Sequence, residues 1–428
     1  MASCSRPGES HRRAHAARAA AGAVLALLLA LGGCGRSAPA PQGWAGDYRV
    51  ALQLPGGELP FGLELRDAQG RLRATLVNGE ERIEISEATL TGDRLTLRLP
   101  GLQTELQAGR KPGGRLEGAV TMIKQHAVRQ VIPLVATRGS DYGFFADPPT
   151  PTTQVTGRWA VTFTDDDGAE SLGVGEFRQE GANVFGTFLT PTADHRYLSG
   201  QMRGDTLFLR SFNGGHAFLY HLRVTGEAMS GDYWSGLASH ERVAGHRDEN
   251  ASLGDAESAA HMKPGEERLS FRLPDLSGRP VSLDDERFRG KVVVVTLGGS
   301  WCPNCHDEAA FFTPWYRELA PQGLEIVGLM FEQSADRAEA VSAVERFRDR
   351  YAIEYPLLIA GENDREQAQR LLPQLSAVLA YPTTIFIDRA GKVRRVHTGF
   401  SGPATGVHYD ELRRDFDRTV RELLAEKP

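Results

Sequence analysis

The feature that most constrains this 428-residue chain is the pentapeptide Trp-Cys-Pro-Asn-Cys at 301–305. It follows four consecutive valines at 292–295 and precedes a segment of helical character at 306–319. This order predicts a buried strand that feeds a helix through a Cys-x-x-Cys turn, the arrangement that tunes a thiol for disulfide exchange. Cys302 would lie at the helix N-terminus, where unpaired backbone N–H groups and the helix dipole favour a thiolate.

The two cysteines are expected to have different roles. Cys305 lies three residues after Cys302, on the same helical face and within reach of a disulfide. In this interpretation Cys302 attacks a substrate sulfur and Cys305 resolves the mixed disulfide. Pro303 suits the first helical turn, because its missing N–H has no intrahelical partner to lose. No cofactor is expected beyond the redox-active Cys302–Cys305 pair.

Residues 265–428 resemble the thioredoxin-like proteins of the TlpA/ResA type, which are membrane-tethered bacterial thiol–disulfide oxidoreductases. The resemblance rests on Trp-Cys-x-x-Cys, on a glutamate three residues after the second cysteine, and on Tyr-Pro-Thr-Thr at 381–384 before an apolar strand. It implies a cis peptide bond that faces the dithiol, since cis bonds are essentially confined to proline, and a glutamate that affects the cysteine pKa values. The site residues that it implies are Cys302, Cys305, Pro382, Glu308 and Trp301 for catalysis, and Tyr381 and Thr383 for substrate binding.

Two features depart from the family pattern, at position 296 and between the cysteines. Two other interpretations of the cysteine motif, a zinc site and a structural disulfide, also stay open. The residue six before Cys302, which is acidic in thioredoxin itself, is Thr296, so no buried aspartate is available there as a proton acceptor. The Pro-Asn dipeptide between the cysteines leaves the redox potential open. A zinc site would need two further ligands, for which His306 is the nearby candidate; we expect no metal. A purely structural disulfide is the second alternative.

The N-terminus has the pattern of an export signal. Residues 1–18 carry four arginines, and residues 19–31 are apolar but too short to span a bilayer. Residues 31–34 resemble the bacterial lipoprotein box, which implies lipidation of Cys34 and a periplasmic protein held at a membrane by lipid. By resemblance to the sorting rules of enteric lipoproteins, Gly35 after the cysteine implies the outer membrane. An ordinary signal peptide with a chance cysteine is the alternative.

The number of cysteines favours a redox protein, and the net charge argues against a nucleic-acid-binding protein. Of four cysteines, Cys4 would leave with the signal and Cys34 would carry lipid, so one pair remains. An exported protein with one dithiol uses it for redox chemistry rather than as a scaffold. The net charge of −6, without a concentrated basic patch, argues against binding to nucleic acid.

Two β-rich units are expected before the redox domain. Alternating apolar and polar residues separated by glycine-containing turns predict antiparallel strands, six to eight in each unit. Segments 88–98 and 198–210, segments 115–118 and 228–231, and Trp44 and Trp159 line up at a spacing of about 112 to 115 residues, which indicates an internal duplication. The second unit also holds a cluster of aromatic, histidine and glycine residues at 211–216, 221, 233–236 and 240. It is interpreted as packed core with glycine-rich turns, or as a surface that docks the redox domain or its substrate.

The redox domain is expected to alternate strands and helices around a partly parallel sheet. Strands are predicted near 292–297, 324–330, 357–360, 384–388 and 393–398, and helices near 304–320, 336–350, 364–372 and 409–425. The fold class is therefore multi-domain, with duplicated antiparallel β units followed by an α/β thioredoxin-like domain. The expected boundaries are 1–33 for the signal peptide, 34–43 for a tether, 44–138 and 155–246 for the β units, 139–154 and 247–266 for linkers, and 267–428 for the redox domain.

The function that this pattern favours is reduction of protein disulfides, with electrons supplied by a membrane partner, since an exported dithiol meets an oxidising compartment. The resemblance suggests cytochrome c biogenesis as a setting. A peroxiredoxin-like antioxidant is one alternative, although Gly299 stands where peroxidatic sites usually have threonine. A partner-binding lipoprotein with a vestigial redox domain is another.

Overall fold

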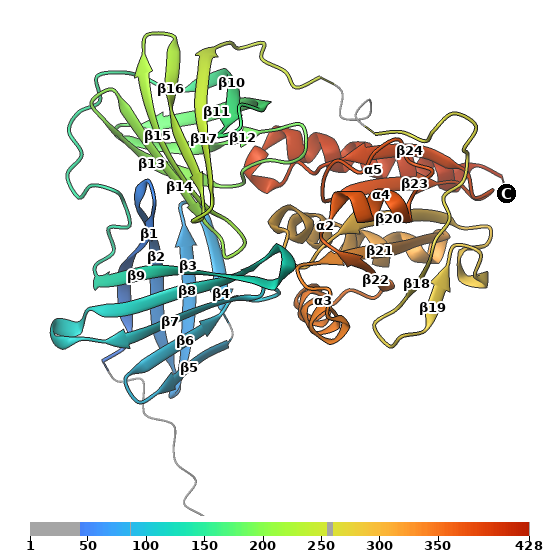
Figure 1. Ribbon diagram of the computed structural model, residues 1–428, viewed down its shortest axis with the longest axis horizontal. Helices are drawn as coiled ribbons and strands as arrows, with labels where there is room; N and C mark the ends of the chain where they lie inside the picture. Colours follow the sequence, from blue (N-terminus) through green and yellow to red (C-terminus); the bar gives the residue numbers. More distant parts are fainter. Residues whose placement is uncertain (1–42, 86, 255–259, 428) are drawn as a thin grey trace, which may run out of the picture. The chain divides into compact units, whose positions relative to one another are not determined.

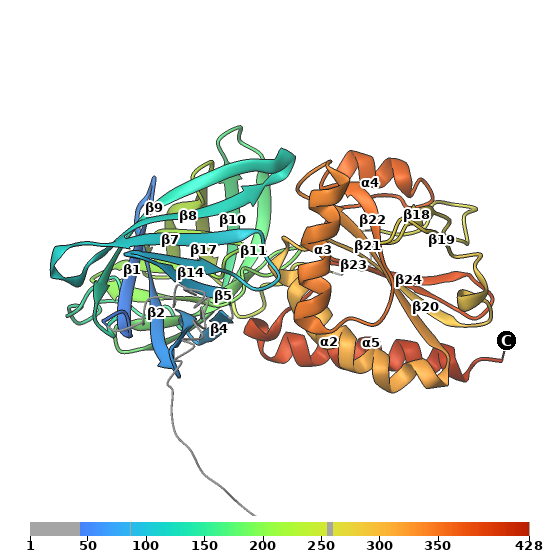
Figure 2. The same cartoon turned by 90° about the horizontal axis from the view of Figure 1, so that it is seen from below.

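The computed structural model describes residues 43–85, 87–254 and 260–427. Two antiparallel β sheets come first along the chain and an α/β domain follows (Figures 1 and 2). The expected signal peptide, the lipidation site Cys34 and the tether up to residue 42 lie outside the described residues. In the part of the chain that the structure describes, no helix is both long and apolar enough to cross a membrane.

The first β unit is a meander of nine strands whose first strand pairs with its last, so the sheet curls and leaves β4 and β5 as its edges. The expectation of six to eight strands is wrong here, because a short additional strand, β4, alternates exposed and buried residues and joins the sheet. The strands are β1 (Gly46–Leu54), β2 (Gly57–Ala68), β3 (Arg71–Asn78), β4 (Glu81–Ile85), β5 (Glu87–Thr91), β6 (Arg94–Arg98), β7 (Thr104–Arg110), β8 (Leu116–Lys124) and β9 (Val128–Arg138).

The second β unit is a closed barrel of eight antiparallel strands, within the expected number. Large side chains fill its interior, as in other small barrels; Trp159, Phe163, Phe188 and Tyr220 are at most 2% exposed. The strands are β10 (Gly157–Asp165), β11 (Glu170–Glu180), β12 (Asn183–Leu189), β13 (Leu198–Arg203), β14 (Thr206–Phe212), β15 (Ala217–Thr225), β16 (Ala228–Ser235) and β17 (Ser239–Arg247).

The two β units share structural details at matching positions. The turns at 92–93 and 204–205 each join two paired strands. Gly118 and Gly231 each lie where an added Cβ would collide with the carbonyl oxygen of a neighbouring strand, at 1.8 and 2.0 Å. Both positions therefore need glycine for the same reason, the close approach of a neighbouring backbone.

The counterpart of Trp159 is Tyr48 rather than Trp44, which corrects the alignment made from the sequence. Trp159 and Tyr48 lie on the first strand of their units, and each donates a hydrogen bond to the carbonyl four residues earlier. Each ring also lies under an arginine of the last strand, Arg247 at 4.5 Å and Arg138 at 5.1 Å. Tyr48 carries this role in the first unit, and Trp44 precedes the strand.

The two β units pack on each other, and the segment between them is held in place. The rings of Phe61 on β2 and Phe212 on β14 lie 4.7 Å apart. In the expected linker, Tyr142 lies against Gly62 of the first sheet, and the backbone N–H of Phe145 donates to Gln201 of the barrel at 2.8 Å. The linker thus packs against both units.

From residue 292 onward the α/β domain has the expected strands and helices, each boundary within two residues of its predicted position. Its sheet has the order β22-β21-β20-β23-β24, parallel from β20 to β22 and antiparallel from β20 to β24. The elements are the hairpin β18 (Arg272–Pro274) and β19 (Pro280–Ser282), then β20 (Val292–Gly298), α2 (Pro303–Leu319), β21 (Leu324–Glu332), α3 (Arg337–Tyr351), β22 (Leu357–Glu362), α4 (Arg365–Leu371), β23 (Thr383–Ile387), β24 (Val393–Thr398) and α5 (Val407–Ala425).

The valine run forms the central strand of this sheet because both faces of β20 are covered. Val292 and Val294 belong to one apolar core, which also contains residues of α2, α3 and α5. Val293 and Val295 belong to a second core on the opposite face. A strand buried on both sides needs apolar residues throughout rather than in alternation, and it ends where the cysteine motif begins.

Candidate active site

Cys302 is the N-cap of α2, as the sequence predicted. Its backbone is extended (φ −92°, ψ 110°), and its sulfur accepts a hydrogen bond from the backbone N–H of Cys305 at 3.3 Å. Pro303 occupies the first helical turn. Both cysteines are free thiols in this structure, so the site is described in its dithiol form.

The loop at 381–382 faces this dithiol. The Tyr381–Pro382 peptide bond is cis, as the resemblance implied, and the Cys302 thiol donates to the Tyr381 carbonyl oxygen at 3.5 Å. The Trp301 ring meets the Tyr381 ring edge-on, with centroids 6.0 Å apart. Thr383 is fully buried and its hydroxyl donates to the carbonyl of Ala380 at 2.8 Å, so its side chain holds the loop.

Glu308 supplies the buried carboxyl group that position 296 lacks. The hydroxyl of Thr296 donates to one carboxylate oxygen at 2.5 Å, and the hydroxyl of Thr384 donates to the other at 2.6 Å. Burial raises the pKa of Glu308 to about 7. Burial, followed by the neighbouring Cys302 and the charge of Glu308, raises the pKa of Cys305 well above that of an ordinary thiol. The buried acid therefore comes from the helix instead of from the strand.

The free energy of unfolding of the wild-type protein is expected to fall as pH rises from 4.5 to about 7. Replacing Glu308 with glutamine should make this fall smaller. The folded-state pKa of about 7 lies above the ordinary value of 4.5, so the folded protein keeps a proton that the unfolded chain releases. The free energy of unfolding therefore falls between those two pH values. The wild-type protein should lose on the order of 3 kcal/mol more than the variant across this window.

Urea unfolding at pH 4.5, 6.0 and 7.5 measures this difference. Hydrogen-exchange mass spectrometry follows peptides of α2 and β20 in the same samples. Glu318→Gln is the matched control, because Glu318 lies on the same helix with its side chain 59% exposed. Equal pH slopes in wild type and Glu308→Gln would show that Glu308 titrates normally.

Two further polar groups fix the loop before the cysteines. The backbone and hydroxyl of Ser300 donate to the buried carboxylate of Glu332 at 2.9 and 2.6 Å. The His306 ring is held by the Ser300 carbonyl at 2.7 Å and the Tyr351 hydroxyl at 2.9 Å. Both ring nitrogens of His306 are thus engaged, and it does not act as a zinc ligand here. Among the described residues, no group of three or more His, Cys, Asp or Glu is arranged to hold a metal ion.

The barrel contacts both residues between the cysteines. Arg196, in the segment between β12 and β13, donates to the Pro303 carbonyl at 2.6 Å. Asp194 accepts from the side-chain amide of Asn304 at 3.1 Å and from the backbone of Gly402 at 2.7 Å. No sequence motif marks Asp194 or Arg196, so the analysis of the sequence missed them.

The glycine-rich turn at 213–216 also lies on the cysteine motif. A Cβ added to Gly215 would come within 2.4 Å of the Pro303 ring and 3.2 Å of the Trp301 carbonyl oxygen, and one added to Gly214 would meet Leu99 at 2.1 Å. This part of the aromatic and histidine cluster docks the redox domain. The rest is structural: Trp234, for example, packs against residue 56 of the first sheet.

These contacts bury the dithiol. Cys302 and Cys305 are only 4% and 3% exposed. Exchange with another sulfur requires access to Cys302. Access therefore requires either a shift of the segments that cover the motif or a substrate group small enough to enter beside them.

Comparisons with known proteins find relatives of the C-terminal part of the chain. Residues 264–396 match the AhpC/TSA family. The thiol–disulfide oxidoreductase ResA of Halalkalibacterium halodurans is 32% identical over 137 residues, which cover 32% of this chain and 69% of the relative. The ResA protein of Bacillus subtilis is 28% identical over 138 residues, with shares of 32% and 69%. A thiol:disulfide interchange protein of the thioredoxin family from Chlorobium tepidum, known from its crystal structure, is 23% identical and aligns over 37% of this chain and 96% of its own, with a TM-score of 0.29.

Proposed function

Because this chain belongs to the family of ResA thiol–disulfide oxidoreductases, we propose that it is a periplasmic, membrane-anchored reductase of disulfide bonds that acts through Cys302 and Cys305. The observation that carries the proposal is the free dithiol at the N-terminus of α2, facing the cis-proline loop. The pattern that ends in Cys34 supports the lipid anchor and an exported location. Protein disulfides, including the haem-site cysteines of cytochrome c, are the proposed substrates.

The proposed reaction moves two electrons from the dithiol to the substrate. The Cys302 thiolate attacks one sulfur of the substrate disulfide, the S–S bond breaks, and the released sulfur takes up a proton. Cys305 then loses its proton and attacks the Cys302 sulfur, which releases the second substrate thiol and leaves a disulfide in the protein. A membrane electron donor would return the two electrons, and no bound cofactor is needed.

The environments of the two sulfurs support this order. The backbone N–H of Cys305 donates to the Cys302 sulfur, which stabilises negative charge on the attacking group. The raised pKa of Cys305 keeps the resolving thiol protonated until the mixed disulfide has formed. The carboxyl group of Glu308, with its pKa near 7, is the group that we propose accepts the Cys305 proton.

We also infer that the two β units arose by duplication. The matching turns, the paired glycines and the equivalent Tyr48 and Trp159 positions support this inference. Their role in the proposal is to cover the dithiol and to select what reaches it.

Cys305→Ala is expected to accumulate mixed disulfides between Cys302 and the natural substrate. Without the resolving thiol the second exchange step cannot occur, so the intermediate persists. The variant is expressed in the native cell, free thiols are blocked in acid, and partners are identified from gels with and without reductant. The Cys302→Ala/Cys305→Ala double variant is the control. Equal capture by both variants would exclude Cys302 as the attacking sulfur.

A peroxidase is the second candidate, since the matched family bears the AhpC/TSA name. Peroxide consumption by the purified reduced protein, at a rate that exceeds its disulfide reduction, would favour this candidate. An inert protein in both assays would favour a partner-binding lipoprotein with a vestigial redox domain.

A further inference from the structure

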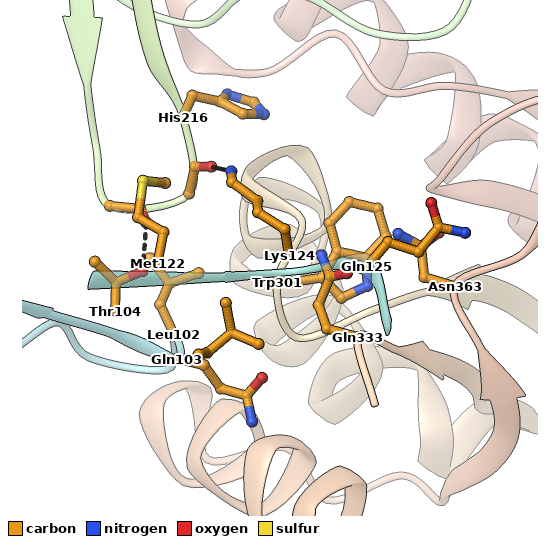
Figure 3. Close-up of a pocket in the computed structure, with 13 residues that line it drawn as sticks. Leu102, Gln103, Thr104, Met122, Lys124, Gln125, His216, Trp301, Gln333 and Asn363 are labelled. Carbon is orange, nitrogen blue, oxygen red and sulfur yellow. Dashed lines mark hydrogen bonds between the residues drawn. The ribbon is translucent and has the colours of Figure 1, made fainter. Parts of the chain in front are cut away.

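A cavity of about 280 Å³ lies against Trp301 of the cysteine motif, between residues of both β units and of the α/β domain (Figure 3). The β units contribute the start of β7, the end of β8 and the β14–β15 turn, and the α/β domain contributes Trp301, Gln333 and Asn363. Trp301 directly precedes the attacking cysteine. The volume equals that of about nine water molecules, enough for one or two side chains or for a small thiol compound.

Lys124 brings an uncompensated positive charge to this cavity. It extends from the end of β8, and its ammonium group donates to the Gly215 carbonyl oxygen at 3.2 Å, a neutral acceptor (Figure 3). Among the described residues that line the cavity, none is an aspartate or a glutamate. Burial lowers the pKa of Lys124 to about 8, so the group remains mostly protonated at neutral pH although no anion offsets its burial.

Arg196 shows how this chain treats a buried cation when the partner is internal. Its guanidinium lies 2.5 Å from a carboxylate oxygen of Glu81 and 2.9 Å from one of Asp307. Buried charges are normally paired in this way. Arg210 is also buried and has only neutral acceptors, Asn78 and the Tyr142 carbonyl. Lys124 differs from Arg210 in that it borders a cavity with room for an anion.

Two polar atoms at the same cavity also lack partners. Within the described residues, Nδ1 of His216 and Oε1 of Gln333 are buried without a hydrogen bond, and Gln333 is 4% exposed. Such atoms are rare, because a buried polar group usually has a partner. A neutral His216 ring with its proton on Nδ1 would donate to a bound carboxylate, whereas Oε1 of Gln333 is an acceptor and needs a donor such as water, while Leu102 and Trp301 provide apolar wall.

We propose that this cavity binds a carboxylate group of the disulfide substrate, with Lys124 as its counter-ion. The proposal rests on the proposed function, since it names the substrate class of the same dithiol. The carboxylate is that of an acidic residue next to the reacting cysteine of a peptide, or that of a small carboxylated disulfide. Its binding would hold the substrate S–S bond beside Trp301 and Cys302, where the exchange described above takes place.

The experiment measures the rate at which each of three small disulfides oxidises the reduced full chain. Dithiodipropionate is anionic, bis(2-hydroxyethyl) disulfide is neutral and cystamine is cationic. Each rate is divided by the rate at which dithiothreitol reduces the same compound, which removes differences in leaving-group chemistry. A second arm uses disulfides of short peptides with Glu, Gln or Lys beside the cysteine. Lys124→Met and Lys124→Gln remove the charge, and Lys111→Met, at an exposed lysine of the same sheet, is the control.

The wild type and Lys111→Met should prefer the anionic over the cationic compound by about tenfold. Both Lys124 variants should lose that preference, measured as the ratio of the anionic to the cationic rate within each variant. If only the peptide disulfides show a preference for negative charge, the bound carboxylate is that of an acidic residue beside the substrate cysteine. If only the small compounds show it, the bound carboxylate belongs to a small disulfide. No preference in either arm, with normal reduction of the neutral compound, overturns the carboxylate subsite alone. Failure to reduce any disulfide overturns the proposed function itself.

Discussion

Replacing Cys302 with serine is expected to lower disulfide exchange by at least about a thousandfold, to the uncatalysed rate. A hydroxyl group is not ionised at neutral pH and cannot form the mixed disulfide. The loss should be complete although serine can also cap the helix, since Cys302 is the N-cap of α2 and serine is among the preferred N-cap residues. Stability should therefore stay close to that of the wild type, which separates loss of chemistry from loss of fold.

The measurement is single-turnover reduction of bis(2-hydroxyethyl) disulfide, with thermal unfolding recorded in parallel. Cys305→Ser is the matched control: it should react once with the disulfide and stop at the mixed disulfide. Residual multiple turnover in Cys302→Ser, or a first step that is lost equally in both variants, would show that Cys305 is able to attack and would reverse the assigned roles.

The elements of the redox domain could be predicted because their signals are local. The valines of β20 mark a strand buried on both faces, and the Cys-Pro pair marks the start of a helix. The turns at 92–93 and 204–205 likewise repeat a local pattern, which located the two β units. In such cases a few neighbouring residues determine the structure.

The cover over the dithiol could not be predicted, because it depends on contacts between residues distant in sequence. Arg196 reaches Pro303 from 107 positions away, and Lys124 reaches Gly215 from 91 positions away. Neither residue belongs to a motif or a periodic pattern. Glu308, by contrast, was expected near the dithiol from the family resemblance. Only its hydrogen bond from Thr296, the position without an acid, had to come from the structure.

The buried dithiol gives the β units a functional meaning beyond packing. The Pro-Asn dipeptide, which left the redox potential open in the sequence, is bound by the barrel through both of its residues. The same segment of barrel limits access to Cys302. Access to the sulfur and the position of the helix N-terminus are therefore coupled through a few contacts, which include those of Arg196 with Pro303 and Asp307.

Replacing Arg196 with methionine is expected to lower the free energy of unfolding by about 3–5 kcal/mol, because it leaves buried carboxylates without their cation. The side chains of Arg196, Glu81 and Asp307 are 9%, 10% and 11% exposed, so water screens them little. This single guanidinium joins β4, the barrel and α2, and its loss should also loosen the cover over the cysteines. Alkylation of Cys302 by iodoacetamide should become faster in the variant.

Thermal unfolding, hydrogen exchange in the first turn of α2 and the alkylation rate measure these effects together. Arg178→Met is the control, since Arg178 forms its ion pair with Glu80 at an exposed site, with the two side chains 50% and 56% exposed, where such pairs contribute about 1 kcal/mol or less. Adding Asp307→Asn to Arg196→Met should restore part of the stability, because it removes one of the unpaired charges, and the double-mutant cycle isolates that coupling. If Arg196→Met leaves stability and alkylation at wild-type values, the barrel does not hold the helix through this residue, and the cover over Cys302 must depend on the Gly214–Gly215 turn instead.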